Sequence, residues 1–263
     1  MNILEEIAEH AKERVKASKL NFGTKEIEVK AFELPKGDFT FKKAISKEGL
    51  SFICECKKAS PSKGIIAENF PYLDIALEYE AAGADAISVL TEPKWFLGKN
   101  EYLKEIAVSV DIPILRKDFT VDEYMIYEAK ILGASAVLLI VALLSREQIK
   151  EYLDICDRLG LSALVECHDA EEINIAVEAG AELIGVNNRN LKDFSVDIGL
   201  SGNLRSKVPN GVLFVSESGI KGVQDIEAVK KIGADAVLVG EALMRAENKK
   251  GMLESFKKAY DKE

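Results

Sequence analysis

Histidine is scarce in this sequence, and its cysteines are not spaced as metal ligands. There are two histidines, His10 and His168, in 263 residues, so Ser-His-Asp catalysis has little support. The four cysteines form no Cys-x-x-Cys pair and have no histidine at zinc-ligand spacing, which argues against a metal cluster or a disulfide framework. We therefore predict no metal site, buried reduced thiols and a solvated loop position for His168.

Long apolar runs and long basic runs are also missing. No stretch approaches the roughly 18 apolar residues of a membrane span, and the start of the chain lacks the apolar core of a signal peptide. The chain has 35 basic and 44 acidic residues, a net charge of -9, and no basic run that would indicate a nucleic-acid surface. We expect a cytoplasmic protein with no membrane or nucleic-acid partner, and we predict no obligate protein partner.

The chain does contain a regular alternation of short β-branched runs and helical patterns. From Ile53 to Val237 the runs recur about every 26 residues, which is the length of one strand plus one helix. This alternation predicts a parallel sheet. The eight predicted strands are residues 51–57, 86–91, 113–118, 136–141, 162–167, 183–188, 213–218 and 236–241.

A second repeat supports the same architecture. Gly-Ala recurs at Gly83, Gly133, Gly180 and Gly233, each time at the end of a helical pattern and before a strand. The spacings of 50, 47 and 53 residues each span two strand-helix units. We therefore favour an α/β fold of the (β/α)8 TIM-barrel type over a doubly wound sheet, which usually has five or six strands.

The whole chain, residues 1–263, is predicted to be a single barrel domain. Residues 48–263 form the barrel, and residues 1–47 form an N-terminal helical extension. The extension is amphipathic at its start and irregular through Pro35-Lys36-Gly37. It could cap the barrel or cover its mouth, since a barrel has two ends to close.

Charged residues occur where the predicted strands end. The alternation of the first strand places Glu55 and Lys57 inside the barrel and points Cys54 and Cys56 toward the helices. Burying such charges costs several kcal/mol, so they must satisfy one another, as a salt-bridge cluster, or bind a ligand. Barrel enzymes carry their active sites at this end. The other polar strand ends are Lys117, Glu166, Asn187 and Glu217.

Several loops at the same end have the composition of a binding site. Gly219 and Gly240 follow the last two strands and precede helical patterns, so nearby backbone N–H groups can face an anion such as phosphate. The loop from Ala59 to Gly64 adds Ser60 and a lysine. Aromatic residues follow the second and third strands, at Trp95, Phe96 and Phe119, and would suit an aromatic substrate in combination with the charges.

Together these residues resemble one family, the indole-3-glycerol phosphate synthases. The matching segments appear in order between about residues 50 and 245, and their combination is specific although no single motif is. They are Glu55-Cys56-Lys57-Lys58-Ala59-Ser60-Pro61-Ser62, Leu90-Thr91-Glu92 with Trp95-Phe96, Lys117-Asp118-Phe119, Leu164-Val165-Glu166, Asn187-Asn188-Arg189 and Glu217-Ser218-Gly219-Ile220.

The resemblance implies an enzyme that closes and decarboxylates 1-(2-carboxyphenylamino)-1-deoxyribulose 5-phosphate, without a metal or an organic cofactor. It implies that Lys117 is the general acid, that Glu166 stabilises positive charge and moves protons, and that Glu55 holds Lys57 near the substrate carboxylate. The remaining residues implied by the resemblance are Asn187 and Glu217 for the polar chain, Ser60, Arg189, Ser218, Gly219, Gly240 and Glu241 for the phosphate, and Phe96 and Phe119 for the ring.

Glu241 departs from the expected pattern, because its carboxylate would lie beside the phosphate unless the side chain turns away or pairs with a base. Two other functions remain as alternatives. An aminoribulose phosphate isomerase would use a Cys/Asp or Asp/Asp pair, but Cys54 and Cys56 are predicted to point outward and Asp118 to face away from Lys117. A catalytically silent barrel would have lost at least one of the implied catalytic groups.

Overall fold

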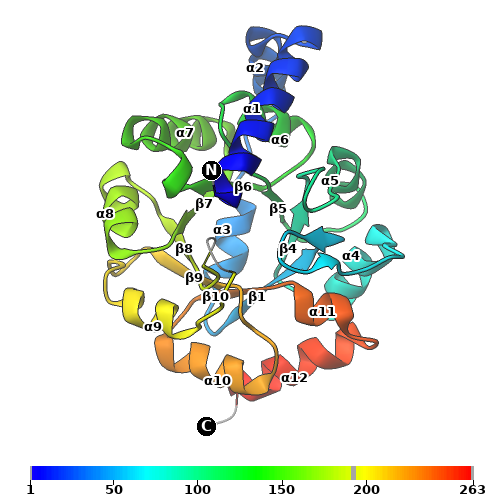
Figure 1. Cartoon of the computed structure of the whole chain (residues 1–263), viewed down its shortest axis with the longest axis vertical. Helices are drawn as coiled ribbons and strands as arrows, with labels where there is room; N and C mark the ends of the chain where they lie inside the picture. Colours follow the sequence, from blue (N-terminus) through cyan, green and yellow to red (C-terminus); the bar gives the residue numbers. More distant parts are fainter. Residues whose placement is uncertain (1, 191–193, 262–263) are drawn as a thin grey trace.

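Parallel strands close into a barrel surrounded by helices (Figure 1). The computed structural model describes residues 2–190 and 194–261. Within these residues each barrel strand pairs with its neighbours in chain order, and the last strand pairs with the first. The eight barrel strands are β1 (Ser51–Cys56), β4 (Ala86–Leu90), β5 (Ile114–Lys117), β6 (Ala136–Ile140), β7 (Ser162–Cys167), β8 (Leu183–Asn187), β9 (Leu213–Glu217) and β10 (Ala236–Val239).

The strands confirm the sequence prediction, with ends that differ by at most two residues. The glycines of the four Gly-Ala pairs all have positive φ, between 72° and 95°, as expected for left-handed helix ends.

A short hairpin, β2 (Ala59–Ser60) with β3 (Gly64–Ile65), follows the first strand. The helices that follow the barrel strands are α4 (Tyr72–Ala81), α5 (Asn100–Ala107), α6 (Tyr124–Ile131), the 3-10 turn η1 (Val141–Leu143), α7 (Arg146–Leu159), α8 (Ala170–Ala179), α9 (Gly199–Arg205), α10 (Val223–Ile232), α11 (Glu241–Arg245) and α12 (Lys249–Asp261).

Two apolar cores lie on the two faces of the sheet. The outer core packs the helices against residues such as Phe52, Cys54 and Cys56, which confirms their predicted outward orientation. The inner core fills the barrel with alternate residues such as Ile53 and Leu115. All four cysteines are buried and free, as predicted.

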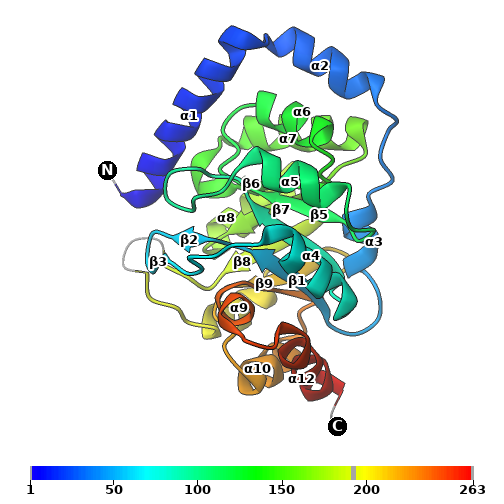
Figure 2. The same ribbon diagram turned by 90° about the vertical axis from the view of Figure 1, so that its right-hand side faces the viewer.

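The N-terminal extension places helices at both ends of the barrel (Figure 2). It comprises α1 (Ile3–Asn21), α2 (Thr24–Glu33) and α3 (Thr40–Ile45), so the sequence prediction missed two helices around the irregular segment. Figure 2 places α1 and α3 at opposite ends of the barrel. Phe41 and Ile45 of α3 are fully buried in the inner core, at the amino-terminal end of the strands. Helix α3 is thus part of the barrel core, and residues 1–47 include two of its fully buried side chains.

Nothing in the described chain resembles a membrane-spanning helix in length and apolar character.

Candidate active site

A cavity of about 700 Å³ opens at the carboxyl ends of the barrel strands. The structure brings together every site residue named from the sequence, because all fourteen line this cavity. They come from distant parts of the chain and meet only because parallel strands in a barrel end on the same side. They are Glu55, Lys57, Ser60, Phe96, Lys117, Phe119, Glu166, Asn187, Arg189, Glu217, Ser218, Gly219, Gly240 and Glu241.

Lys117 lies between two carboxylates at the centre of the cavity floor. Its Nζ donates hydrogen bonds to Glu166 Oε2 and to Glu217 Oε2, both at 2.7 Å. Asn187 Nδ2 donates to the other oxygen of Glu166 at 3.1 Å. The side chains of Lys117, Glu166 and Glu217 are 14%, 3% and 2% exposed, so these charges interact in a poorly hydrated environment.

The two carboxylates differ in their electrostatic environments. Burial would raise the pKa of Glu166, but the charge of Lys117, the charge of His168 and the hydrogen bonds from Lys117 and Asn187 lower it. Burial raises the pKa of Glu217, and repulsion from Glu166 adds to this against the opposing effect of Lys117. Burial would lower the pKa of Lys117, but Glu166 and Glu217 raise it. The site therefore combines a charged ammonium, an ionised carboxylate and a carboxyl group that holds its proton more tightly.

A second ion pair lies at the end of β1. Lys57 Nζ is 2.5 Å from Glu55 Oε1, and Ser88 Oγ lies 3.4 Å from the other oxygen of Glu55. This pair needs a glycine opposite it, because a Cβ added at Gly240 would lie 2.4 Å from Glu55 Oε1 and 2.9 Å from Lys57 Nζ. Gly240 thus leaves room for the Glu55–Lys57 ion pair, in addition to its place in the loop that follows β10.

Gly185 makes room for Glu217 in a similar way, and the sequence prediction missed this role. A Cβ added at Gly185 would lie 2.1 Å from Glu217 Oε1. Gly185 is on β8 and pairs with Val215 of the neighbouring strand. A side chain at this position would therefore compete with the Glu217 carboxylate for the same space.

Polar groups gather on one side of the cavity mouth. Arg189 Nη1 lies 3.3 Å from Ser62 Oγ. Ser218 has a left-handed backbone with φ 65°, and its carbonyl accepts a hydrogen bond from Asn188 Nδ2 at 3.1 Å. Glu241 pairs with Arg245, with Nε 3.0 Å from Oε1. The Glu241 carboxylate therefore pairs with a base, which is one of the two arrangements expected from the sequence.

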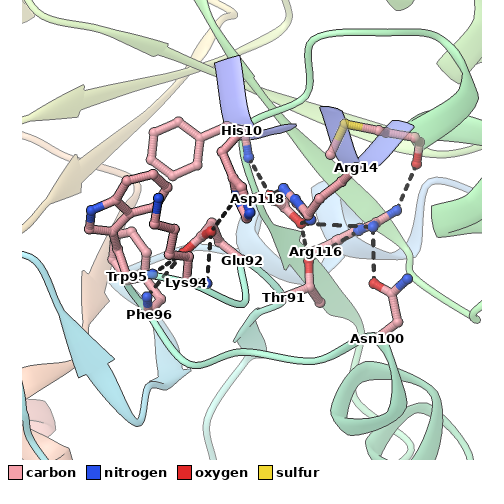
Figure 3. Close-up of polar contacts among 12 residues, drawn as sticks. His10, Arg14, Thr91, Glu92, Lys94, Trp95, Phe96, Asn100, Arg116 and Asp118 are labelled. Carbon is pink, nitrogen blue, oxygen red and sulfur yellow. Dashed lines mark hydrogen bonds and ion pairs between the residues drawn. The ribbon is translucent and has the colours of Figure 1, made fainter. Parts of the chain in front are cut away.

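Aromatic and apolar groups gather on the opposite side. The ring centroids of Phe96 and Phe119 are 6.1 Å apart. The loop that carries Phe96 is held by Glu92, whose carboxylate accepts hydrogen bonds from the backbone N–H groups of Lys94, Trp95 and Phe96 at 3.0, 2.7 and 3.0 Å (Figure 3). Trp95 makes an edge contact with His10, 5.4 Å between centroids, and does not line the cavity.

Helix α1 is fixed to the barrel beside this aromatic pair. Arg14 binds the buried carboxylate of Asp118 with both terminal nitrogens, and His10 lies 3.4 Å from Glu92 (Figure 3). Asp118 therefore faces α1 rather than the floor of the cavity, as the strand alternation predicted. The cavity is also lined by three apolar residues of α1 that the sequence prediction did not include, namely Ile3, Leu4 and Ile7.

His168 is not the solvated loop residue that we predicted. Its side chain is only 20% exposed, and its Nε2 lies 3.5 Å from Glu166 Oε1. On the other side, Nδ1 lies 3.2 Å from Glu172 Oε2. The residue follows β7 immediately, so the strand carries it to the same end of the barrel as Glu166.

No group of three or more His, Cys, Asp or Glu side chains suited to a metal ion occurs among residues 2–190 and 194–261. The charges around the cavity are lysines and arginines together with carboxylates. This set matches acid-base chemistry on an anionic organic substrate.

Comparison with known proteins identifies the family. The family model for indole-3-glycerol phosphate synthase matches residues 4–256. The chain belongs to this family. Indole-3-glycerol phosphate synthases are carboxy-lyases of tryptophan biosynthesis, and that is the class of this enzyme.

Relatives in the indole-3-glycerol phosphate synthase family are similar over nearly their whole length. The enzyme of Ruminiclostridium cellulolyticum is 57% identical over 245 residues, 93% of this chain and 94% of the relative. The enzyme of Endomicrobium trichonymphae is 54% identical over 247 residues, 94% of this chain and 96% of the relative. That of Lachnoclostridium phytofermentans is 48% identical over 267 residues, 97% and 98% of the two chains.

More distant solved structures share the fold of the family. A 3-hexulose-6-phosphate synthase from Salmonella typhimurium superposes with a TM-score of 0.67 at 17% identity, covering 80% of this chain and 98% of that chain. A mandelate oxidase superposes with a TM-score of 0.58 at 19% identity, covering 72% and 68% of the two chains. At these identities the likeness concerns the barrel alone.

Proposed function

We propose that the lysine-carboxylate cluster at the floor of the cavity is the catalytic centre for indole-3-glycerol phosphate formation. The substrate is 1-(2-carboxyphenylamino)-1-deoxyribulose 5-phosphate, and the products are indole-3-glycerol phosphate, CO2 and water. The observation that carries the proposal is the position of Lys117, 2.7 Å from both Glu166 and Glu217 inside a cavity that is polar at one side and aromatic at the other.

Lys117 is the proposed general acid. Its ammonium group is stabilised by two carboxylates, so it is charged at neutral pH and presents a proton at the floor of the cavity. Protonation of the ketone oxygen makes the adjacent carbon electrophilic, and the anthranilate ring attacks it. A positioned acid of this kind contributes roughly 10²- to 10⁴-fold to the rate.

Glu166 and the Glu55–Lys57 pair are the proposed partners in the later steps. Attack by the ring leaves positive charge on the substrate, which the ionised Glu166 stabilises until CO2 is lost. Lys57, oriented by Glu55 at 2.5 Å, contacts the substrate carboxylate and assists loss of the hydroxyl group as water. Glu166 then accepts the proton that leaves carbon as the indole forms.

Asn187 and Glu217 are the proposed contacts for the polar chain of the substrate. Both lie on the cavity floor beside Glu166 and Lys117. The phosphate is proposed to bind at the mouth, where Arg189 and Ser60 supply side-chain donors. The backbone N–H groups proposed to complete this phosphate site belong to Ser218, Gly219, Gly240 and Glu241.

The anthranilate ring is proposed to lie against Phe96 and Phe119, which flank it as a contacting pair, near the first turns of α1. Ile3, Leu4 and Ile7 also line the cavity, so α1 excludes water from the ring while the phosphate anchors the other end of the substrate.

We also propose a cytoplasmic location, in keeping with four buried free thiols. The proposal needs no organic cofactor, nucleic acid or protein partner.

The substitution Lys117→Ala tests the assignment of the general acid. We expect turnover to fall by roughly 10²-fold or more, because the group acts mainly in the transition state. Lys42→Ala is the matched control, since Lys42 forms a partly exposed ion pair with Glu182 at the opposite end of the barrel. Circular dichroism reports whether both variants fold. A loss confined to substrate affinity would reassign Lys117 to binding.

A further inference from the structure

The overall reaction requires a proton from outside the site in every turnover. Two protons are added to the ketone oxygen before it leaves as water, and one proton is removed from carbon as the indole forms. When the substrate carboxylate is ionised, its loss as CO2 releases no proton. The balance is one proton taken up per turnover. This proton must reach the floor of the active-site cavity, which the bound substrate and α1 separate from the cavity mouth.

Beyond the cavity floor, the catalytic cluster of Lys117, Glu166 and Glu217 contacts one further titratable side chain among the described residues. Lys117 donates to Glu166 and Glu217. In the described part of the chain, Glu217 Oε1 has no hydrogen-bond partner. Glu166 also contacts Asn187, whose amide does not titrate, and His168. Among the contacts of the described residues, His168 is thus the titratable group that connects Glu166 with the side of the barrel away from Lys117 and Glu217.

His168 is oriented for such a connection. Glu172 Oε2 accepts a hydrogen bond from the backbone N–H of His168 at 2.7 Å and lies 3.2 Å from its Nδ1. This carboxylate holds the ring with Nε2 3.5 Å from Glu166 Oε1. Among the described residues, the buried Nε2 has no hydrogen-bond partner, which is uncommon for a buried polar atom in a folded protein.

A second cavity lies on the far side of His168. It has a volume of about 620 Å³ and includes His168, Glu172 and Asn187 in its lining. Exposed residues form part of its wall, so it gives water access to this side of the ring. Of the charged groups that line it among the described residues, most are acidic and favour an incoming proton. They are Glu5 of α1, Asp169 and Glu172 at the start of α8, and Arg189 and Asp197 after β8.

We propose that His168 is a proton relay that supplies the Lys117–Glu166 pair from the second cavity. The inference rests on the proposed role of Glu166. Protonated His168 transfers the proton on Nε2 to Glu166, which passes it to Lys117 after the lysine has protonated the substrate. The imidazole is then neutral, with its remaining hydrogen on Nδ1. A turn of the ring about Cβ–Cγ, a broad torsion for histidine, presents the free nitrogen to Glu172 and the water beyond it.

The electrostatic environment supports a protonated His168. Burial would lower the pKa of the imidazole, but the hydrogen bond to Glu172 and the charges of Glu166, Glu172 and Glu217 raise it above its ordinary value. A histidine of this kind is charged in a larger fraction of molecules at neutral pH. It can therefore deliver a proton and be recharged in the same cycle.

The substitution His168→Gln separates proton transfer from positioning. Glutamine can donate a hydrogen bond to Glu166 but cannot carry a proton. We expect turnover at low buffer concentration to fall at least about 10-fold, and we expect imidazole added to the buffer to restore it with a saturating concentration dependence. Glu172→Gln should lose less activity and also be rescued. Glu171→Gln, an exposed carboxylate beside Glu172, is the matched control and should not change turnover.

Each other outcome overturns the relay. Turnover equal to wild type in His168→Gln would show that protons reach Glu166 by another route. A loss that imidazole does not restore would make His168 a positioning residue only. Both results require a wild-type chain that forms product, whereas a wild-type chain without product would contradict the proposed function itself.

Discussion

Arg14 of α1 binds Asp118, the residue that follows Lys117, through two hydrogen bonds of 2.7 and 3.1 Å. Burial would raise the pKa of the Asp118 carboxyl, but the charge and hydrogen bonds of Arg14, with help from Arg116 and Thr91, lower it. The pair joins the helix that covers the cavity to the strand end that carries the proposed acid. Docking of α1 and the position of Lys117 are therefore linked by one buried contact.

Substitution Arg14→Gln should weaken substrate binding more than it slows turnover. Loss of the pair leaves Asp118 without its main partner and loosens the apolar lid formed by Ile3 and Leu4. We expect KM to rise about 5-fold or more with kcat changed less, and stability to fall by about 2 kcal/mol or more. Lys12→Gln is the control, because Lys12 pairs with Glu9 on the exposed face of the same helix.

Steady-state kinetics and urea unfolding of these two variants measure both effects. An unchanged KM in a destabilised Arg14→Gln protein would mean that α1 stabilises the fold without contributing to the substrate site. Point substitutions are preferable to deletion of residues 1–47, because that deletion removes Phe41 and Ile45 from the inner core.

Substitution Gly185→Ala should impair catalysis without unfolding the barrel. The added Cβ would lie 2.1 Å from Glu217 Oε1, so the carboxylate must leave the position in which its other oxygen contacts Lys117. We expect kcat to fall about 10-fold or more, since one charge partner of the general acid is displaced. Gly202→Ala is the control, because its Cβ would meet Ile232 at an ordinary 3.5 Å. Equal kinetics for the two variants would show that the Glu217–Lys117 contact is not needed.

The raised pKa of Glu217 predicts a specific pH dependence of stability. Burial, with repulsion from Glu166, outweighs Lys117 and raises the pKa from 4.5 to about 7. The folded state therefore binds a proton that the unfolded chain has released, and the resulting stabilisation is complete below about pH 4.5 and is lost as the pH rises to about 7. Glu217→Gln removes this titration. Relative to wild type, its free energy of unfolding should increase by about 1–3 kcal/mol between about pH 5 and about pH 8.

Urea unfolding at both pH values measures this difference. Glu227→Gln, at an exposed position on α10, is the control for the general effect of removing a carboxyl group. A difference between wild type and Glu217→Gln that stays constant with pH would contradict a shifted Glu217.

The barrel and its floor could be predicted from the sequence because they depend on local patterns. Each strand is a short β-branched run, and the alternation within β1 was enough to direct Glu55 inward and Cys54 outward. Residues that end parallel strands must meet, so Lys117 and Glu166 could be brought together without any knowledge of their contacts.

The contacts around the floor could not be predicted, because they depend on how distant segments dock. Arg14 is one of several basic residues on an amphipathic helix, and nothing in its neighbourhood in the sequence singles out Asp118 as a partner. His168 was misplaced for the opposite reason, since its turn-like, charged neighbours suggested solvent. The position immediately after Glu166-Cys167 was the available signal, because it lies at the same strand end.

The most direct test of the catalytic centre is a fluorescence assay for indole-3-glycerol phosphate, with purified wild-type protein and Glu166→Gln assayed side by side. The substitution keeps the size of the side chain and removes the charge that Lys117 and Asn187 hold in place. We predict that the wild-type chain converts the carboxyphenylamino-deoxyribulose phosphate to product and that Glu166→Gln, although folded, does so at least about 10²-fold more slowly. Turnover by Glu166→Gln at the wild-type rate would contradict the assignment of this cluster as the catalytic centre.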